Sequence, residues 1–473
     1  MTTSSDAPGT PGPHEPQKML VPLQKVEIKN FRGIRDIAFT LHPKVTVFFG
    51  ANAAGKTSIL DALAIGLGAI AARVPKASGR SFAKTGDLRV PWKDRRELGE
   101  RASVECPYMR ITLTTESGIR WDVSRLRSVQ DRPSLAKLLA TGALHVALDP
   151  VIKEILDSPP GELTRPLPLV AAYGTERALV DVPLRERYFQ KEFPRLAALD
   201  SSLAAATRFK TVFEWFRVKE DEERYEGQRL RDLDYKLPAL QWVRRAVQNA
   251  QLRCRAPRVE LHPIRMLVDF EHLTGEVEPL NIDALSDGYR THFSLVVDIA
   301  RRMVQLNPSD DLDDPHRGTN TEAVILIDEI DLHLDPAWQA RVVQGLIAAF
   351  PNAQFVLTTH SEQVIGSVGA ESVHKLVWGD GEILLESVPF AQGATGERIL
   401  IELMGAPERV PGKVTTQLNQ YQQLIDSGSG DTAEAHRLRA ELEDALPQEP
   451  TLHQADLELQ RRSLMAALGR PSR

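Results

Sequence analysis

The sequence predicts an α/β fold in which a phosphate-binding loop follows a buried strand. The stretch "GANAAGKTS" (50–58) comes directly after the short apolar run "VTVFF" and opens a helical pattern. A second run, "AVILI" (323–327), is apolar throughout, as strands of a parallel sheet are when both faces are covered. A third apolar run, "AQFVLTT" (353–359), follows about one helix later. This alternation of strands and helices is typical of α/β proteins.

Length and composition limit the number of domains and the class of protein. The chain of 473 residues predicts about two to three domain-sized units. No run of about 18 apolar residues occurs, so no membrane span is expected. The N-terminus is rich in Pro, Gly, Ser and Thr and lacks the pattern of a secretory signal. Because the chain has only two cysteines, we expect no disulfide framework and a cytoplasmic location.

The first elements are a strand pair and the phosphate loop. "LQKVEIKNFRGIRDIAFTL" alternates apolar and polar residues around a turn at Arg32-Gly33. The loop then matches the pattern G-x-x-x-x-G-K-[ST]. Its glycines let backbone N–H groups turn toward phosphate oxygens. The predicted nucleotide contacts are Gly50, Asn52, Gly55, Lys56, Thr57 and Ser58.

Two of these residues carry specific chemistry. Lys56 is expected to place its charge against the β- and γ-phosphates, and the hydroxyl of Thr57 is expected to bind Mg²⁺. The helix that begins here points its N-terminus at the anion. A chance glycine-rich turn is the alternative, but a strand before and a helix after the loop favour nucleotide binding.

Polar residues follow the two later strands. Asp328 and Glu329 come directly after "AVILI", at the strand end where α/β sheets bind ligands. We expect Asp328 to hold Mg²⁺ with Thr57, and Glu329 to orient and polarise the attacking water. His360 ends the next strand and is assigned to the γ-phosphate. Lys56, Glu329 and His360 are the predicted catalytic residues. Taken separately, two acids could cap a strand and the histidine could be an ordinary polar residue.

A Ser-x-Gly turn opens a long amphipathic helix before the carboxylate strand. The stretch "ALSDGYR" (284–290) resembles the signature loop of the ATP-binding cassette class, which reads like "LSGGQ", and departs from it at Asp287 and Tyr289. The resemblance implies that Ser286 and Gly288 contact an ATP held by a second subunit, so that two chains enclose two ATPs. "LHLDP" resembles the D-loop of the class, which places Asp335 at that interface. A plain helix cap is the alternative.

Other segments indicate the branch of this class. "VEIKNFRGIRDIAF" resembles the opening strands of RecF- and SMC-like ATPases, and no sustained heptad pattern follows the phosphate loop. The implied fold is a P-loop NTPase of ABC-ATPase type, with a mixed sheet lobe, a helical insertion and a helical C-terminal region.

Three further segments narrow the resemblance. They are "LPLVAAYGTERA" (167–178), "VFEWFRVKEDEERYE" (212–226) and "GERILIELMGAPERVPGKV" (396–414). Together with the signature they resemble the family described as predicted ATP-binding proteins involved in virulence, over about residues 22–465. This family includes the ATPase subunit of Septu anti-phage systems and related retron ATPases. The resemblance implies an ATP- and Mg²⁺-dependent ATPase that forms a homodimer and controls a partner nuclease in anti-phage defence.

The predicted organisation has five parts. Residues 1–20 are a disordered tail, and residues 21–128 form the N-terminal half of the ATPase with the phosphate loop. Residues 129–260 are a mostly helical insertion. Residues 261–390 carry the signature, the carboxylate strand and His360, and residues 391–473 form a helical C-terminal region. This last segment is short for a domain and shows no His-Asn-His pattern, so any cutting of DNA is expected to be done by another chain. The family resemblance implies that this partner is a separate HNH-type nuclease.

The runner-up function is a RecF-like ATPase that binds DNA. Two basic stretches bear on it: one includes Arg73, Lys76, Arg80 and Lys84, and the other runs from Lys236 to Arg258 without an acid. Solvated helix faces are one interpretation of these stretches and phosphate-backbone contacts are the other. Two interpretations of Arg32 remain open, a nucleotide contact and an ion pair within the turn. For Arg177 the two interpretations are a nucleotide contact and a structural ion pair. Asp87 stands where the class can carry a Mg²⁺-sensing Gln.

Overall fold

The computed structural model describes residues 20–75, 77–91, 105–128, 142–159, 162, 164–178, 192–204, 209–261 and 263–467. The chain divides into two compact units, Met1–Ile399 and Leu400–Arg473. The predicted tail falls largely outside the described residues. Among the described helices, none combines the length and the hydrophobicity needed to span a membrane.

The first unit begins with an antiparallel sheet of order β2-β1-β4-β5. Buried residues alternate with more exposed ones in the middle of β1 and in the second half of β2, and the cross-strand pair Ile28 and Ile37 places two buried side chains on the inner face. The predicted turn at Arg32-Gly33 joins these two strands. The strands are β1 (Leu23–Phe31), β2 (Ile34–Thr40), β4 (Tyr108–Thr115) and β5 (Arg120–Leu126).

A second, mixed sheet of six strands has the order β13-β12-β3-β11-β10-β6. Its strands are parallel except β13, which pairs antiparallel with β12. β6, β10 and β11 are buried at every residue because helices or strands cover both faces. The bounds are β3 (Val45–Gly50), β6 (Leu169–Tyr173), β10 (Ala323–Ile327), β11 (Ala353–Thr359), β12 (Val373–Gly379) and β13 (Glu382–Ser387).

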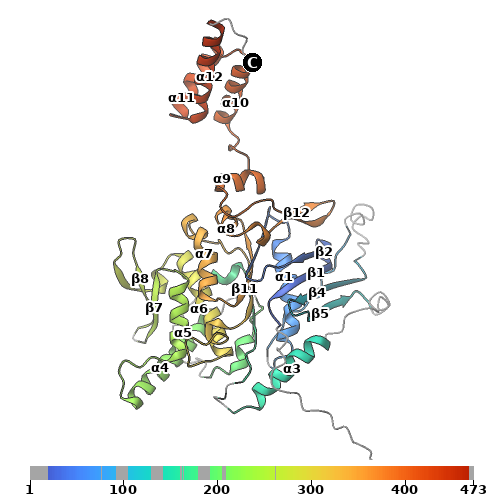
Figure 1. The fold of residues 1–473 in the computed structure, drawn as a ribbon, viewed down its shortest axis with the longest axis vertical. Helices are drawn as coiled ribbons and strands as arrows, with labels where there is room; N and C mark the ends of the chain where they lie inside the picture. Colours follow the sequence, from blue (N-terminus) through green and yellow to red (C-terminus); the bar gives the residue numbers. More distant parts are fainter. Residues whose placement is uncertain are drawn as a thin grey trace, which may run out of the picture. The chain divides into compact units, whose positions relative to one another are not determined.

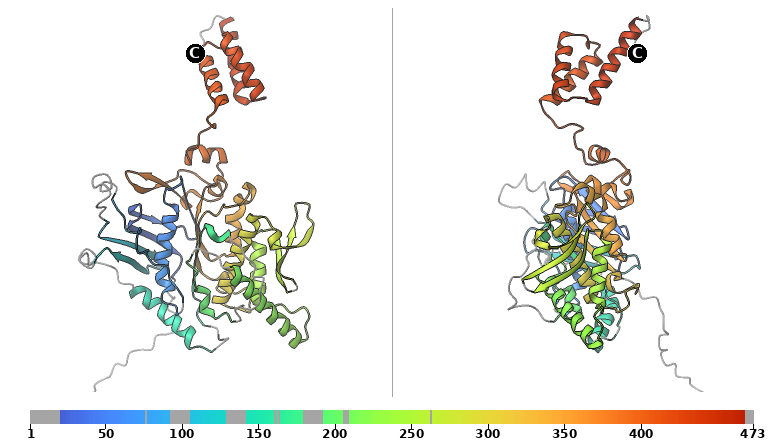
Figure 2. Two further views of the ribbon diagram at one scale, coloured as in Figure 1. Left: turned by 180° about the vertical axis from the view of Figure 1, so that it is seen from behind. Right: turned by 90° about the vertical axis from the view of Figure 1, so that its left-hand side faces the viewer.

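Helices fill the space on either side of this sheet. The helix α1 (Lys56–Ala71) contacts β4 and β5 of the first sheet and β3, β6 and β10 of the second, so it lies between the two sheets (Figure 1). α6 (Asp287–Leu306) and α7 (Pro336–Ala349) lie on the other face, and α5 (Pro238–Asn249) packs against both (Figures 1 and 2). The predicted α/β fold class is confirmed.

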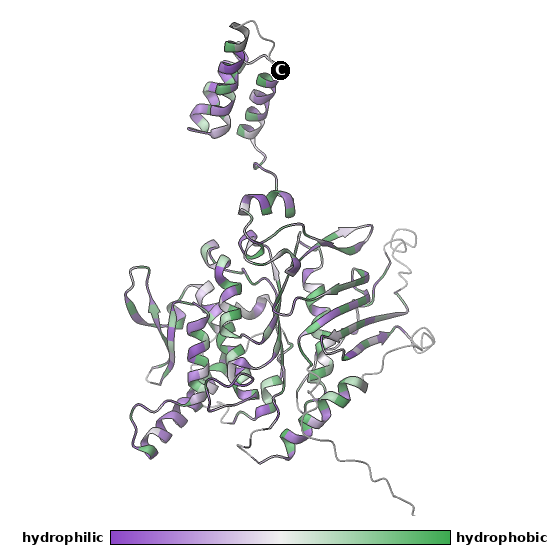
Figure 3. Ribbon diagram, in the orientation of Figure 1, coloured by the Kyte–Doolittle hydropathy of each residue, from purple (hydrophilic) through white to green (hydrophobic). Residues whose placement is uncertain are grey.

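Residues 129–260, predicted to be mostly helical, also contain strands. They include α3 (Gly142–Asp157) and α4 (Phe209–Leu230), but β6 lies in the main sheet. A third sheet, of order β7-β8-β9, crosses the expected boundary at residue 260. Figure 3 shows that much of α4 is hydrophilic, whereas the strands and α1 are rich in hydrophobic residues. The strands of the third sheet are β7 (Cys254–Leu261), β8 (Ile264–Glu271) and β9 (Val277–Asn281).

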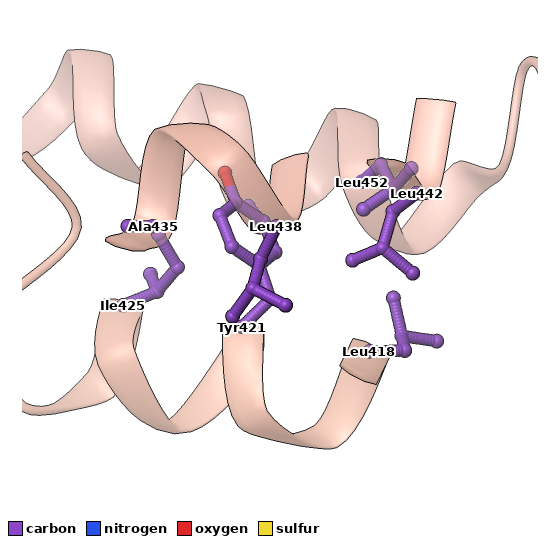
Figure 4. Packing of buried hydrophobic residues seen from close by; sticks show 8 residues of the cluster. Leu418, Tyr421, Ile425, Ala435, Leu438, Leu442 and Leu452 are labelled. Atoms are coloured by element: carbon purple, nitrogen blue, oxygen red, sulfur yellow. The ribbon is translucent and has the colours of Figure 1, made fainter. Parts of the chain in front are cut away.

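The second unit contains a three-helix bundle. Its helices are α10 (Lys413–Asp426), α11 (Ala433–Ala445) and α12 (Pro450–Ala467). Leu418, Tyr421 and Ile425 of α10 face the buried side chains of α11 (Figure 4). The predicted turn at "SGSGD" joins α10 to α11. Two short helices, α8 (Glu362–Gly366) and α9 (Gly396–Arg398), belong to the first unit.

Candidate nucleotide-binding site

The phosphate loop joins β3 to α1 and depends on two glycines. Gly55 precedes α1 with a φ of 100°, in the left-handed region that favours glycine. A Cβ on Gly55 would lie 2.3 Å from Cδ1 of Ile383, and one on Gly50 would lie 2.3 Å from the carbonyl oxygen of Leu376. Both glycines are therefore required by the fold of the loop. Asn52 is exposed in the same loop and Ser58 is half-buried in the first turn of α1.

Lys56 lies at the first position of α1 and is only 7% exposed. Its Nζ donates to the carbonyl oxygens of Gly50 (3.0 Å) and Ala51 (3.1 Å), so the ammonium group lies over the loop. Burial lowers the pKa of Lys56, while the nearby carboxylates, Glu329 first, oppose this shift. When phosphate binds, this ammonium group can exchange the two carbonyl oxygens for phosphate oxygens, and the fold of the loop need change little.

Thr57 and Asp328 meet at the ends of α1 and β10. The Thr57 hydroxyl donates to Oδ2 of Asp328 (2.9 Å), and the Thr358 hydroxyl donates to Oδ1 (2.5 Å). The backbone N–H of Asp328 donates to the carbonyl of Tyr173 (2.8 Å) on β6. A hydroxyl beside a carboxylate is the hard oxygen set that Mg²⁺ prefers, with its remaining positions left to water and phosphate. These two residues fit the predicted metal contacts.

Glu329 occupies a constrained backbone position after β10. Its φ of 46° lies in the left-handed region, which is uncommon for a residue other than glycine. Its N–H donates to the Thr358 hydroxyl (2.8 Å), and the N–H of Ile330 donates to the Thr358 carbonyl (3.0 Å). Thr358 therefore fixes both Asp328 and Glu329 from the neighbouring strand. The parallel pairing of β10 with β11 makes this contact possible.

His360 follows β11 at the same edge of the sheet. Its N–H lies 3.3 Å from both carboxylate oxygens of Asp331, and the Thr359 hydroxyl donates to Asp331 (2.6 Å). Asp331 thus positions the end of β11, a role that the sequence alone did not reveal. The sequence feature that could have revealed this role is the third acid in "DEID", three residues after Asp328. The structure therefore brings Lys56, Thr57, Asp328, Glu329 and His360 to the carboxyl ends of β3, β10 and β11.

The predicted signature forms a second group, at the start of α6. Ser286 is the exposed residue that precedes α6, and its side chain makes no capping hydrogen bond. A Cβ on Gly288 would lie 2.2 Å from the carbonyl oxygen of His333, so the helix start lies against the turn after Glu329. In that turn, Asp335 caps α7 by accepting from the N–H of Trp338 (3.1 Å). The structure thus joins the signature and D-loop segments.

Tyr289 and Asp287, the two residues that depart from the signature loop of the ATP-binding cassette class, have structural contacts. The Tyr289 ring lies 4.2 Å from that of Trp338 on α7 and 5.2 Å from that of Phe270 on β8, measured between centroids. Asp287 accepts from Arg290 (2.6 Å) one turn later on the same helix. Tyr289 therefore packs the start of α6 against α7 and the third sheet.

Asp87 and Arg32 pair with each other. Arg32 Nε donates to one carboxylate oxygen of Asp87 (2.9 Å), and the N–H of Ala83 donates to the other (2.6 Å). Arg32 also donates to Asp61 on α1 (2.7 Å), and Asp61 pairs with Arg80. This geometry supports the ion-pair interpretation of Arg32, and it leaves the Mg²⁺-sensing assignment of Asp87 without support. The side chain of Arg177 lies outside the described residues.

A buried charge network in α6 was also missed from the sequence. Asp298 accepts from Arg301 (2.6 Å) and Arg302 (2.8 Å), and the Tyr173 hydroxyl donates to it (2.9 Å). Burial opposes ionisation of Asp298, but the two arginines outweigh it and hold its pKa well below the ordinary value. The sequence pattern that could have predicted this network is an acid followed by arginines three and four residues later in an otherwise apolar helix.

Most of the arginines in the two basic stretches are paired with acids from other segments. Arg244 pairs with Glu223 (3.1 Å) and Arg258 with Asp269 (2.7 Å). Arg245 pairs with Asp313 (3.2 Å), and Arg73 with Asp149. Lys76 lies outside the described residues. These ion pairs favour the interpretation of solvated faces over a continuous phosphate-backbone surface.

Two family models match the chain. One, described as an AAA domain, covers residues 25–237. The other, described as an AAA domain, putative AbiEii toxin, Type IV TA system, covers residues 158–366. Both matches indicate an ATP-binding domain of the AAA type.

Known proteins are also similar to this chain. The retron Ec83 probable ATPase of Escherichia coli is 25% identical over 92% of this chain and 86% of that protein. The Septu protein PtuA of Bacillus mycoides is 38% identical, over 22% of this chain and 13% of PtuA. A solved SMC head domain from Thermotoga maritima aligns with a TM-score of 0.37 at 14% identity, over 78% of this chain and 99% of that one. The predicted resemblance to retron and Septu ATPases is confirmed.

Proposed function

We propose that this chain is the ATP-hydrolysing subunit of a bacterial anti-phage defence system, and that it controls a partner nuclease. The observation that carries the ATPase part is the convergence of Lys56, Thr57, Asp328, Glu329 and His360 at one edge of the six-stranded sheet. The defence part rests on the similarity to retron and Septu proteins.

Each residue of this group has a defined task. Lys56 and the N–H groups of the loop bind the phosphates, while Thr57 and Asp328 hold Mg²⁺, which supplies charge neutralisation during phosphoryl transfer. Glu329 accepts a hydrogen bond from the attacking water and polarises it, and His360 contacts the γ-phosphate. Thr358 and Asp331 fix the orientation of these groups.

ATP binding is proposed to join two copies of the chain. In this arrangement Ser286 and Gly288 at the start of α6 contact the ATP of the other copy, and Asp335 lies at the interface. Support comes from the exposed, uncapped hydroxyl of Ser286 at a helix N-terminus, which is a favourable position for an anion. Closure and opening of this dimer would transmit the state of the nucleotide to the nuclease.

The substitution Glu329→Gln tests the ATPase. It keeps the shape of the side chain and removes its basicity, so we expect Mg²⁺-dependent ATP hydrolysis to fall by about 10²–10⁴-fold while ATP binding persists. Glu371→Gln, an exposed substitution, is the control. Wild-type hydrolysis by Glu329→Gln would contradict the assignment of this residue.

Partner control needs its own experiment. Affinity purification of the tagged chain from its native cells, followed by mass spectrometry, is expected to recover an HNH-type nuclease. Lys56→Ala is expected to abolish phage resistance conferred by the pair in a susceptible host. Repeated recovery of the chain without a nuclease would remove this part of the proposal and leave the ATPase intact.

A DNA-binding ATPase is less well supported. It would need a free basic surface, and the arginines between 244 and 258 that the structure pairs with acids do not offer one.

A further inference from the structure

A cavity of about 330 Å³ lies beside the phosphate loop. Its size is within the range of about 300–1,000 Å³ that is common for small-molecule sites. One wall is made by Gly55 and Ser58, which also belong to the predicted nucleotide contacts. The cavity does not include Thr57, Asp328 or Tyr173, which line a separate hollow on the metal side of the loop. It is therefore placed to receive a part of the nucleotide other than the reacting phosphate.

Three distant segments build this cavity: the β1–β2 turn, residues 86–90 and the β12–β13 hairpin. Trp378 and Ile383 face each other across the hairpin, so their side chains project from the same face. A Cβ on Gly33 would lie 2.8 Å from Cζ3 of Trp378. The hairpin thus lies against both the turn and the loop, as the position of β12 above α1 and β2 in Figure 1 suggests.

The aromatic wall is unusually accessible. Trp378 is 53% exposed, although tryptophan is mostly buried in folded proteins. Apolar Leu88 also belongs to the lining of the cavity. Aromatic faces stack on nucleic-acid bases, and each such contact contributes measurably to affinity. An exposed indole at the rim of a hollow next to a phosphate loop is a suitable stacking surface.

The polar wall contains a buried donor without a partner. Arg89 is 8% exposed, and its Nε has no hydrogen-bond partner among the described residues. One terminal nitrogen is 3.4 Å from the carbonyl of Gly381, and the ion pair with Glu382 is long, at 4.0 Å. A buried donor of this kind is costly unless a ligand supplies the acceptor.

We propose that this cavity binds the base of the nucleotide, with Trp378 stacking on its ring and Arg89 donating to an acceptor on its edge. The chemical class is a purine nucleoside triphosphate. Purines present the N7 acceptor to a guanidinium, whereas cytosine presents an amino donor at the corresponding edge. Their two rings also cover more of the indole. The inference rests on the proposed function, because it takes the phosphates to be held at Lys56.

Comparison of ATP with inorganic tripolyphosphate separates the base from the phosphates. Both are titrated with Mg²⁺ into the full-length chain by calorimetry. Trp378→Ala is expected to weaken ATP binding roughly 5- to 150-fold, the range for loss of one stacked base. Its affinity for tripolyphosphate is expected to stay within about twofold, because the loop is untouched. Trp378→Phe is expected to recover most of the ATP affinity.

Leu384→Ala is the matched control. This residue is 40% exposed on the same hairpin, where it pairs with Val377 and projects from the other face. It is expected to bind both ligands as the wild type does. Arg89→Met is expected to reduce the preference of the wild type for ATP over CTP.

Several outcomes would overturn the inference. Unchanged ATP affinity in folded Trp378→Ala would do so, as would equal affinity of the wild type for ATP and CTP. Equal loss of ATP and tripolyphosphate affinity would show that the variant acts through the loop. A wild-type chain that binds tripolyphosphate but gains nothing from the base would refute only the base site. Failure to bind either ligand would instead refute the proposed function.

Discussion

At the scale of single residues, Ser286 is exposed at the start of a helix. It precedes α6, makes no capping hydrogen bond and lies in the same group as Gly288 and Asp335. A side chain at this position can therefore be changed with little effect on the fold. This makes Ser286 the most direct probe of the proposed dimer.

The substitution Ser286→Arg should block the dimer by adding bulk where the second nucleotide would approach. We expect ATP affinity of the single chain to change by less than about threefold, because Lys56 and its loop are in a different place in the fold. ATP-dependent dimerisation of the Glu329→Gln background should disappear. Light scattering after size-exclusion chromatography, with and without ATP, measures both states.

Thr274→Arg serves as the control for charge and size, because Thr274 is exposed in the turn between β8 and β9. A Ser286→Arg chain that dimerises normally would contradict the proposed contact. Loss of ATP binding by the single chain would place Ser286 at its own nucleotide instead.

At the scale of elements, α6 is tied to β6 by charge as well as by packing. Asp298 is 1% exposed and balances Arg301 and Arg302, while Tyr173 supplies a hydroxyl from the end of β6. Because Tyr173 also accepts from the N–H of Asp328, the network reaches the predicted metal site. One buried carboxylate in the middle of α6 is therefore linked, through Tyr173, to the end of β10.

The substitution Asp298→Asn should leave two buried guanidinium groups without their counter-charge. We expect the free energy of unfolding to fall by about 3–5 kcal/mol. Tyr173→Phe removes only one hydrogen bond and should cost about 1 kcal/mol. Urea denaturation followed by circular dichroism measures both changes.

Asp287→Asn on the same helix is the control, since its ion pair with Arg290 is exposed and should contribute less than about 1 kcal/mol. A loss from Asp298→Asn no larger than the control's would contradict the structural importance of the network.

A buried glutamate on the helix α4 should make the free energy of unfolding depend on pH. Glu220 is 6% exposed and accepts from the N–H of Val259 (3.1 Å), and burial raises its pKa from 4.5 to about 7. Between these values the folded chain binds more protons than the unfolded chain, so the free energy of unfolding falls as pH rises. Glu220→Gln cannot ionise, and its stability relative to the wild type should rise by on the order of 2–3 kcal/mol between pH 4 and pH 8.

Urea unfolding of both proteins at the two pH values measures this difference. Glu222→Gln, an exposed change on the same helix, should show no such dependence. A constant difference between Glu220→Gln and the wild type would contradict the raised pKa.

At the scale of the whole molecule, the chain is divided into two units with separate cores. The helical bundle buries Leu418, Tyr421, Leu438 and Leu442 among its own helices (Figure 4). Arg439 on α11 pairs with Asp456 on α12 (2.8 Å) and adds a polar tie. A core of this size supplies only about 3–5 kcal/mol, so the bundle should be sensitive to a single charge.

The substitution Leu438→Asp should unfold the bundle, because it buries a carboxylate without a partner. The residues proposed to bind the nucleotide belong to the first unit, so ATP affinity should remain within about twofold of the wild type. Loss of helical circular dichroism, together with calorimetric titration of ATP, measures the two effects. Leu457→Asp, at a position 63% exposed on α12, is the control. A joint loss of helicity and ATP binding would contradict the independence of the two units.

The sequence by itself predicted the α/β fold class and the segments that carry the candidate site. The phosphate loop, the Asp328-Glu329 pair and the Ser286 turn could be found because each chemical task restricts residue type and spacing within a short segment. Buried strands and amphipathic helices were predictable for a similar reason, since their patterns repeat locally.

Only the tertiary structure decided which distant residues meet. It placed β6 beside β10, paired Arg32 with Asp87, joined Tyr173 to Asp298 and set Trp378 and Arg89 around one cavity. None of these contacts leaves a local pattern, because the partners lie on separate elements and their pairing depends on sheet order and burial. The physical reason is that local propensities act over a few residues, whereas packing and desolvation act between segments hundreds of residues apart.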